Sequence, residues 1–286
     1  MHKFSLAFIA SLWVSTAALA QNNTPQNETK WGFSGGGGAA ITPHYSGDDD
    51  YAVSALPFAR LSYSDMFFVS VPEGANVKVF EKNGFTTLAT AKIAFNREED
   101  GSAPFRIAGT RTNDLIGLGD VDTSIELGST LRYRLGNWSL SGAMRQAVSG
   151  HDGLVGELSA SYSKMIFGYG PPIRMSFGPS LNFGNNDYMR AYYGVTPAQS
   201  SASGLPQLEA SGGLYSAGVS LSASAPVTNR SALFLQASLS QLTGDARRAP
   251  LVTERGSSTQ AFAGLFWVYT FGQDARRGRR SGRPSR

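Results

Sequence analysis

His44 and Ser46 form the first of two places where this chain could do acid–base chemistry. At this spacing an imidazole can deprotonate a serine hydroxyl, provided that a third group orients the ring. Pro43 precedes the pair and Gly47 follows it, and these flanking residues are typical of a loop edge, which is a poor place to hold a nucleophile rigidly. We therefore expect no hydrolase site here.

His151 and Asp152 form the second place. The two side chains could act as an acid–base pair, but Gly150 and Gly153 on either side favour a tight turn. These are the two histidines that follow the first twenty residues. We predict that the chain has no catalytic residue and is not an enzyme.

Asp48, Asp49 and Asp50 are the residues best suited to a metal ion. Carboxylates could bind a divalent cation or bridge it to lipopolysaccharide, whereas a solvated acidic loop is the simpler interpretation. The chain has no cysteine, which excludes a disulfide framework and a thiolate metal site. We predict no metal and no cofactor.

The elements that would position any such site alternate between apolar and polar residues, a period of two that indicates β-strands. In the last such segment Leu265, Trp267, Tyr269 and Phe271 share one face. An apolar face that ends in aromatic residues suits lipid and its interface, and a polar face suits an aqueous lumen. The pattern predicts an all-β chain, a transmembrane antiparallel β-barrel in the outer membrane.

Twelve segments have this alternation, and short connections rich in Gly, Pro and Asn alternate with longer ones, as in outer-membrane barrels. The predicted strands are 31–41, 51–63, 66–71, 76–81, 85–95, 121–134, 137–148, 154–168, 172–184, 210–225, 230–242 and 258–271. The pair 66–71 and 76–81 is short and is separated by a connection that contains Pro72; merging it would leave ten strands. The longest predicted connections include 96–120, which is either a functional loop that folds inward or a disordered one.

Eight charged residues are expected to face the lumen, and six of them are basic. Two functions are open: an anion-attracting pore, or a narrow barrel that is plugged because the charges pair with each other. A hairpin centred near His151 would set Arg145 opposite Glu157, within reach of an ion pair. The full set is Arg60, Lys92, Glu126, Arg132, Arg134, Arg145, Glu157 and Arg174.

The two ends of the chain differ from the barrel in composition. Residues 1–20 have Lys3, an apolar run and Ala18-Leu19-Ala20, which together indicate a cleaved signal peptide and export. We expect a flexible segment at 21–30, the barrel at 31–271 and a disordered, arginine-rich tail at 272–286. The net charge of +4 comes from Lys3 and the arginine-rich tail, because residues 21–272 hold 18 basic and 20 acidic residues. Nucleic acid is therefore not an expected partner.

Several motifs, taken in order, resemble the MltA-interacting protein (MipA)/OmpV family of outer-membrane proteins. They cover most of the chain: GGGGAAITPHYSGDDDY from Gly35, GTRTNDLIGLGDVDTSIELG from Gly109, Gly150-His151-Asp152-Gly153, the run from Gly178 to Val195, and Leu242-Thr243-Gly244-Asp245.

The resemblance implies a scaffold for peptidoglycan remodelling, which joins a lytic transglycosylase to a murein synthase in the cell envelope. Other members look like surface proteins linked to adhesion. The terminal Tyr269 and Phe271 resemble the signal read by the barrel-assembly machinery, so lipid bilayer, lipopolysaccharide and that machinery are further expected partners. The alternative functions are a narrow pore for small anionic or polar solutes and a surface adhesion protein.

Overall fold

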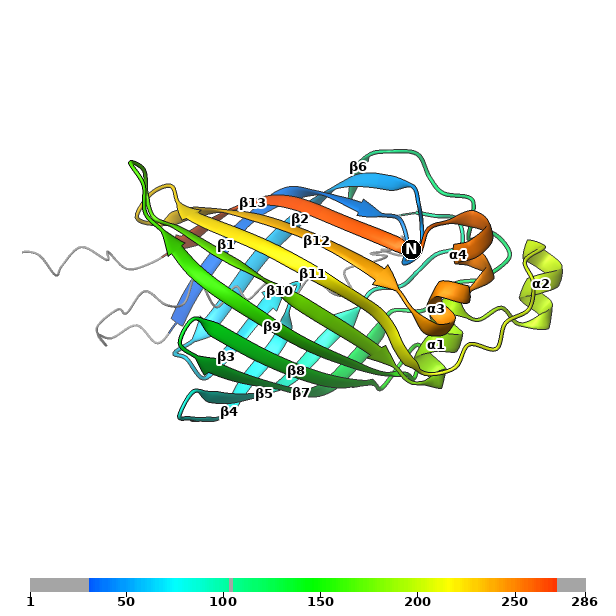
Figure 1. Cartoon of the computed structure of the whole chain (residues 1–286), viewed down its shortest axis with the longest axis horizontal. Coiled ribbons are helices and arrows are strands. Elements are labelled where there is room, and N and C mark those ends of the chain that lie inside the picture. The colour runs from blue at the N-terminus through cyan, green and yellow to red at the C-terminus, as the bar shows by residue number, and fades with distance from the viewer. Residues whose placement is uncertain (1–30, 103–104, 272–286) are drawn as a thin grey trace, which may run out of the picture.

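A computed structural model describes residues 31–102 and 105–271. The expected signal peptide (1–20), the flexible segment (21–30) and the arginine-rich tail (272–286) lie outside the described residues. The chain forms a closed antiparallel β-barrel of twelve strands, with one additional short strand (Figure 1). The strands of the barrel are β1 (Trp31–Pro43), β2 (Tyr51–Tyr63), β3 (Phe67–Val71), β4 (Gly74–Lys82), β5 (Phe85–Ala94), β7 (Ser124–Leu135), β8 (Trp138–Ala147), β9 (Leu154–Ile166), β10 (Ile173–Gly184), β11 (Gly213–Pro226), β12 (Ser231–Leu242) and β13 (Thr259–Phe271).

The barrel closes where β1 pairs with both β13 and β2. Phe33 lies opposite Phe271 on β13 and opposite Leu61 on β2. The predicted twelve strands are confirmed, including the doubtful pair, which forms β3 and β4. The short additional strand β6 (Arg106–Ala108) pairs with β2 and was not expected from the sequence.

The outer face of the barrel is apolar because every second residue of the strands points away from the lumen. Large apolar side chains such as Leu235 and Leu265 are exposed there and face each other across β12 and β13. Exposed apolar surface of this extent requires lipid around it. The fold is therefore that of a transmembrane barrel of the outer-membrane type.

Aromatic pairs mark one rim of the apolar belt, next to the short turns. Each pair lies directly across a ladder, so the register brings the rings into contact. They are Trp31 with Tyr63, Phe33 with Phe271, Phe85 with Tyr133 and Trp138 with Tyr162, with ring centroids between 4.2 and 5.2 Å apart. We call this end of the barrel, which also holds the start of β1 and the finish of β13, the turn end.

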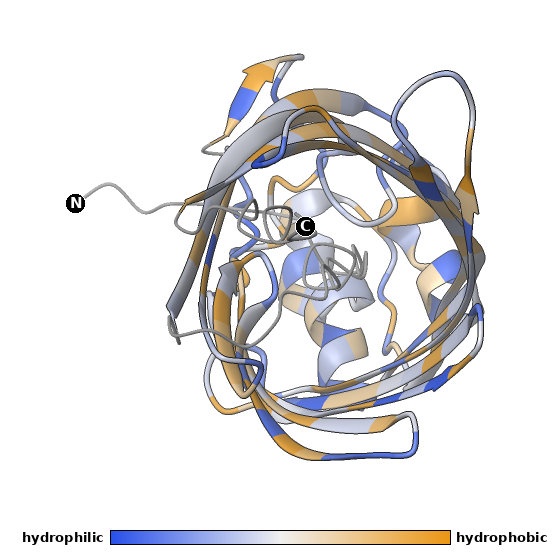
Figure 2. Cartoon of the chain, turned by 90° about the vertical axis from the view of Figure 1, so that its left-hand side faces the viewer, coloured by the Kyte–Doolittle hydropathy of each residue, from blue (hydrophilic) through white to orange (hydrophobic). Residues whose placement is uncertain are grey.

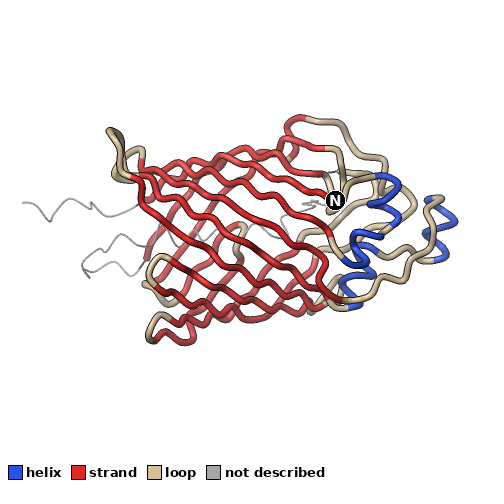
Figure 3. The backbone as a smooth tube through the Cα atoms, in the orientation of Figure 1, coloured by secondary structure: helices blue, strands red, loops and turns tan. Residues whose placement is uncertain are grey.

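The long connections meet at the opposite end, which we call the loop end. They form four short helices there: α1 (Asn186–Tyr193), α2 (Pro197–Ser203), α3 (Gly244–Arg248) and α4 (Pro250–Arg255) (Figure 3). Seen along the barrel from the turn end, helices lie across the far end of the lumen (Figure 2). Among the described residues no helix is long and apolar enough to cross a membrane.

Candidate functional site

The lumen has two chemically different walls. On the side of β2, β12 and β13, Phe58, Phe234 and Val268 point inward and pack together. They can meet because Gly36 and Gly38 on β1 leave the space between β2 and β13 empty of side chains. The other wall is rich in serine, as in the ladder of Ser141, Ser159 and Ser180. This asymmetry gives the lumen a polar side that could face a solute.

A buried cluster of charges centres on Glu126 of β7. Arg145 on β8 donates from Nε to Glu126 Oε2 at 2.8 Å. The other carboxylate oxygen lies 3.5 Å from His151 Nε2. Lys92 lies directly across the ladder from Glu126 and interacts electrostatically with Glu157 as well. The predicted lumen charges of these strands are thus brought together, beside the loop end.

The expected register of Arg145 and Glu157 is wrong. Arg145 lies opposite Val155, and Glu157 lies opposite Ala143, two residues further along the ladder. The reason is that the β8–β9 hairpin is centred on Gly150 rather than on His151, since Gln146 lies opposite Leu154. Glu126 was predicted to face the lumen, but the sequence pattern did not indicate that it would hold Arg145.

A second ion pair lies in the lumen, where the chain turns from β3 into β4. Arg60 donates from Nη1 to Glu73 Oε2 at 3.0 Å, and Ser70 donates to the same oxygen at 3.1 Å. The Arg60 guanidinium also lies 3.8 Å from the ring centroid of Phe68. Sequence reasoning missed Glu73, because it placed this residue in a connection rather than in the lumen.

The three remaining predicted lumen charges are Arg132, Arg134 and Arg174. Arg132 and Arg174 are half-buried and Arg134 is exposed. Within residues 31–102 and 105–271 none of the three forms an ion pair with a carboxylate. They lie toward the turn end of β7 and β10, so basic side chains line that mouth of the barrel.

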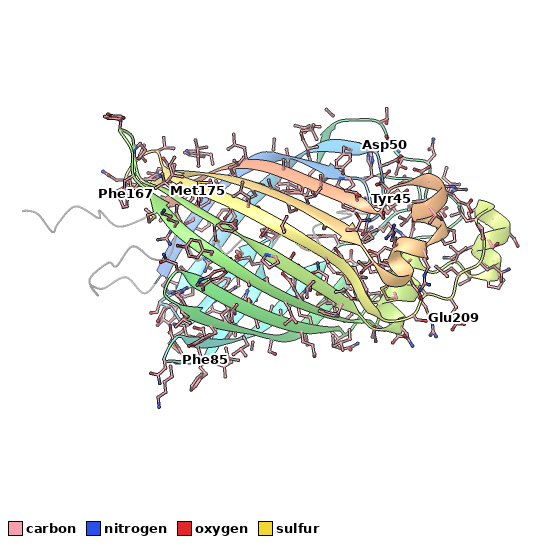
Figure 4. All side chains as sticks on the ribbon, viewed as in Figure 1. Tyr45, Asp50, Phe85, Phe167, Met175 and Glu209 are labelled. Atoms are coloured by element: carbon pink, nitrogen blue, oxygen red, sulfur yellow. The ribbon has the colours of Figure 1, made fainter. Side chains whose placement is uncertain are left out.

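The loops at the loop end form a cap with its own apolar core. Figure 4 shows Tyr45 among these loops. One buried cluster joins four separate connections and consists of Tyr45, Leu115, Leu118, Val195, Leu205 and Leu251. A second one packs α1 and α3 against β9 and β11 and includes Tyr188, Met189, Tyr193, Tyr215 and Val252. The predicted 96–120 loop contributes Leu115 and Leu118 to the first cluster, so it is part of the cap.

Arg255 at the end of α4 ties three of these connections together. Its guanidinium donates to the carbonyl oxygen of Asp114 at 2.7 Å and to that of Ser203. Its own carbonyl oxygen accepts from the Tyr45 hydroxyl at 3.1 Å. Carbonyl oxygens in loops have no ladder partner and need another donor. Arg255 supplies that donor to two segments that lie far apart in the sequence.

Arg97 lies under the cap with only 7% of its surface exposed. Its Nη1 donates to the Tyr192 carbonyl oxygen at 3.0 Å, and no acceptor within the described part of the chain reaches its Nε. Burial raises the pKa of Tyr192 and Tyr193 well above the ordinary value for a phenol, so these neighbours stay neutral.

The side chains of His44 and Ser46 bond to different partners and not to each other. His44 Nδ1 lies 3.0 Å from Asp48 Oδ2, and its Nε2 donates to the Thr110 carbonyl oxygen at 2.9 Å. The hydrogen bond with Asp48 is the main cause that raises the pKa of His44. Ser46 instead shares a hydrogen bond of 2.7 Å with the Tyr193 hydroxyl. These contacts tie the first loop to the cap and do not form a serine–base pair.

His151 is held by its turn. Its Nδ1 accepts from the Gly153 backbone N–H at 3.0 Å, which leaves the ring proton on Nε2, facing Glu126. Asp152 has a positive φ of 52° and is exposed. The histidine therefore packs into the charged cluster, and the aspartate points away from it.

The three aspartates of the first loop are not grouped around one point. Asp48 is fully buried and accepts from the backbone N–H of Asp50, whereas Asp49 and Asp50 are exposed. Within the described ranges no group of three or more His, Cys, Asp or Glu side chains has the geometry to hold a metal ion. The geometry gives no support to the alternative of a cation bound here.

At the turn end the connection between β9 and β10 carries exposed aromatic residues. Phe167 is 77% exposed and Tyr169 is fully exposed. Figure 4 places Phe167 at the turn end, well away from Tyr45 and Glu209. Nearby, Phe271 contacts Phe33 and Tyr269, with ring centroids 5.1 and 4.8 Å apart, so the expected assembly residues close the barrel seam.

Comparison with solved structures gives barrels at low similarity. CdiB from Acinetobacter baumannii has 10% sequence identity and a TM-score of 0.36; the match covers 86% of this chain and 61% of that chain. An anion-selective porin from Comamonas acidovorans has 12% identity and a TM-score of 0.30, with coverage of 84% and 98%. OmpT of Vibrio cholerae, expressed in the outer membrane, has 10% identity and a TM-score of 0.31, with coverage of 87% and 100%. The chain thus spans 61% of the length of CdiB, and likeness at these scores carries no inference about its activity.

No curated protein matches the chain. One family model does match, over residues 35–271, and its description is MltA-interacting protein MipA. This range begins in β1 and ends at the last residue of β13, so it includes the whole barrel apart from the first four residues of β1. The chain belongs to the MltA-interacting protein MipA family.

Proposed function

We propose that this barrel is an outer-membrane scaffold that holds a murein lytic transglycosylase, and through it a murein synthase, during peptidoglycan remodelling. The observation that carries the proposal is the family match over the barrel, because the family is described by its interaction with MltA. In this proposal the expected barrel-assembly machinery inserts the chain, and the barrel itself carries no catalytic residue.

The turn end is the surface that suits such a partner. Outer-membrane barrels have short turns on the periplasmic side, where murein lies, and longer loops outside. Phe167 and Tyr169 project from the longest turn at this end. Exposed aromatic side chains that become buried on binding are the usual anchors of a protein interface. The β9–β10 turn is therefore the proposed docking point for the transglycosylase.

The test is a binding measurement between the barrel in lipid nanodiscs and a purified lytic transglycosylase. The variant Phe167→Ala/Tyr169→Ala should weaken binding by roughly tenfold or more, since interface anchors are each worth more than 1 kcal/mol. Leu135→Ala is the matched control, because Leu135 is 63% exposed at another short turn. Unchanged affinity of the double variant would remove the proposed docking point, and absence of binding by the wild type would remove the scaffold.

A second candidate is a pore for small anionic solutes, and one observation favours it. Arg132, Arg134 and Arg174 make the turn-end mouth positive, and within the described chain no carboxylate pairs with them. Against it, the cap lies across the far end of the lumen (Figure 2). Planar-bilayer recording should show little or no current. Reproducible anion-selective steps that reverse selectivity in Arg132→Glu/Arg134→Glu would support the pore instead.

A further inference from the structure

The two ends of the barrel carry opposite charge. Among the described residues, the connections at the loop end hold fourteen acidic and seven basic residues. At the turn end seven described residues are basic and two are acidic, and both acidic ones, Asp65 and Glu81, bind Lys78. The seven basic residues are Lys78, Lys82, Arg132, Arg134, Lys164, Arg174 and Arg230. The turn end is therefore the end that attracts an anionic partner.

Two of these basic residues face lipid rather than the lumen. Lys82 lies opposite Phe85 in the last pair of the β4–β5 hairpin, and Phe85 points outward, with 42% of its surface exposed. Lys164 occupies the next outward position after Tyr162 on β9, toward the turn end. Both lysines are exposed. In the described strands of the barrel they are the charged residues of the lipid face, since the other strand charges alternate onto the lumen side.

A row of aromatic side chains joins the two lysines along the outer wall. Phe85 stacks on Tyr133 with ring centroids 4.2 Å apart, and Trp138 contacts Tyr162 with centroids 5.2 Å apart. These residues come from β5, β7, β8 and β9, which are neighbours in the sheet. Figure 4 places Phe85 at the turn end. Aromatic residues in such a belt lie at the level of the head groups, so each lysine can extend along the wall and place its ammonium beside the lipid phosphates.

The chain does not supply a counter-charge to either lysine. Within the described residues no carboxylate forms an ion pair with Lys82 or Lys164. Glu81 adjoins Lys82 in the sequence, but it points to the other face of the strand and binds Lys78. Lipid covers the wall at this depth, so the counter-charge is a lipid phosphate. A zwitterionic head group brings its own ammonium, whereas an anionic phospholipid leaves its phosphate to the lysine.

We propose that the outer wall of β4, β5, β7, β8 and β9 at the turn end binds anionic phospholipids such as phosphatidylglycerol. Lys82 and Lys164 each hold a head-group phosphate, and the aromatic row between them packs on the acyl chains. Outer-membrane barrels have their short turns on the periplasmic side, so the bound lipids belong to the periplasmic leaflet. This role goes beyond the scaffold proposal and does not depend on it, since it needs no partner protein.

Trp138 lies within the aromatic row and can report which lipid is beside it. After residue 20 the other tryptophans are Trp31 and Trp267, so Trp31→Phe/Trp267→Phe leaves Trp138 as the reporter. This reporter barrel is reconstituted into phosphatidylcholine vesicles that contain a small fraction of brominated phosphatidylglycerol or of brominated phosphatidylcholine. Bromine quenches indole fluorescence on contact, so the ratio of the two quenching curves measures the lipid preference at this wall.

Brominated phosphatidylglycerol should quench the reporter roughly fivefold more effectively than brominated phosphatidylcholine, the preference that about 1 kcal/mol for one basic residue at an anionic surface gives. Lys82→Gln/Lys164→Gln should remove this preference. Arg134→Gln/Arg174→Gln is the matched control, because it removes two positive charges from the lumen side of the same end, and it should leave the preference unchanged.

Equal quenching by the two lipids in the reporter barrel would overturn the proposal, and so would a preference that survives in Lys82→Gln/Lys164→Gln. Loss of the preference in both double variants would also overturn it, because the overall charge of the turn end would then attract the lipid. Native mass spectrometry of the barrel with all its tryptophans repeats the comparison if the reporter fails to fold. The wild type should retain phosphatidylglycerol that Lys82→Gln/Lys164→Gln loses, and equal retention would contradict the site.

Discussion

Arg145 and Glu126 form an ion pair inside the barrel, with Nε 2.8 Å from Oε2 and both side chains almost fully buried. The partners come from adjacent strands, but they are not directly opposite, since Glu126 lies across from Ala147 and Arg145 from Gly128. Gly128 has no side chain, so the long arginine can lie along the ladder and reach the carboxylate of the next inward residue. This diagonal contact places a complete ion pair where the sequence suggested separate lumen charges.

Glu126→Ala should therefore destabilise the folded barrel by about 3–5 kcal/mol, because it removes the carboxylate that accepts from the buried Arg145 and lies opposite Lys92. Replacing both partners, as Glu126→Met/Arg145→Met, should cost less than the single change, since both charges of the pair are then removed together. Urea unfolding in lipid vesicles measures both. A double variant that is less stable than Glu126→Ala would show that the stability does not depend on pairing.

Leu235→Arg should reduce folding far more than Ser238→Arg. Leu235 points to lipid on β12, where an arginine near mid-membrane costs roughly 2–4 kcal/mol. Ser238 lies on the other face of the same strand, opposite Ser220, and points into the lumen. Heat-modifiable mobility on gels reports the folded fraction. Equal yields of the two variants would contradict the assignment of faces.

Arg255→Ala should loosen the cap without opening the barrel. The change removes the hydrogen bonds to the Asp114 and Ser203 carbonyl oxygens and leaves the strands untouched. Limited proteolysis in vesicles should then cut the loops faster, while heat-modifiability stays as in the wild type. Arg248→Ala is the control: it pairs with Asp245 within one turn of α3, at the surface. Equal cleavage of the two variants would mean that Arg255 does not hold the cap.

The β1–β2 loop (residues 44–50) should be most tightly docked on the cap at acidic pH. The pKa of His44 is raised above its ordinary 6.5 by Asp48, so the folded state binds a proton more tightly than the unfolded one. Its stabilising contribution is therefore complete below pH 6.5 and is lost as the pH rises through the higher, folded value. Hydrogen exchange of residues 44–50 should increase over that interval in the wild type. A His44→Gln variant that kept the same pH dependence would show that another group titrates.

Phe271→Ala should impair assembly, whereas truncation after Gly272 should not. Phe271 packs on Phe33 and Tyr269 where the barrel closes, so its ring contributes to the seam and to the expected assembly signal. The fifteen residues from Gly272 to Arg286 are mainly arginine, glycine and other polar residues. The amount of folded protein in outer-membrane fractions measures both effects. Loss of protein on truncation would assign the assembly information to the tail.

The sequence alone determined the barrel, its twelve strands and, for the clearest strands, which face meets lipid. These features follow from a period of two in hydropathy, which fixes which side chains meet lipid and which meet the lumen. The short turns, rich in Gly, Pro and Asn, set the count, and Tyr269 and Phe271 marked the closing strand. The short pair β3 and β4 was the weak point of the pattern, and it was kept because merging the two segments would break the alternation of short and long connections.

Tertiary structure alone decided which charges meet. The Arg145–Glu126 contact depends on the register of β7 against β8. A turn that is a few residues longer or shorter shifts every pair along the ladder, and an alternation of period two does not specify that register. The cap was equally hidden, since Tyr45, Leu115 and Leu251 come from loops without a common period and become a core when the closed barrel brings those loops together.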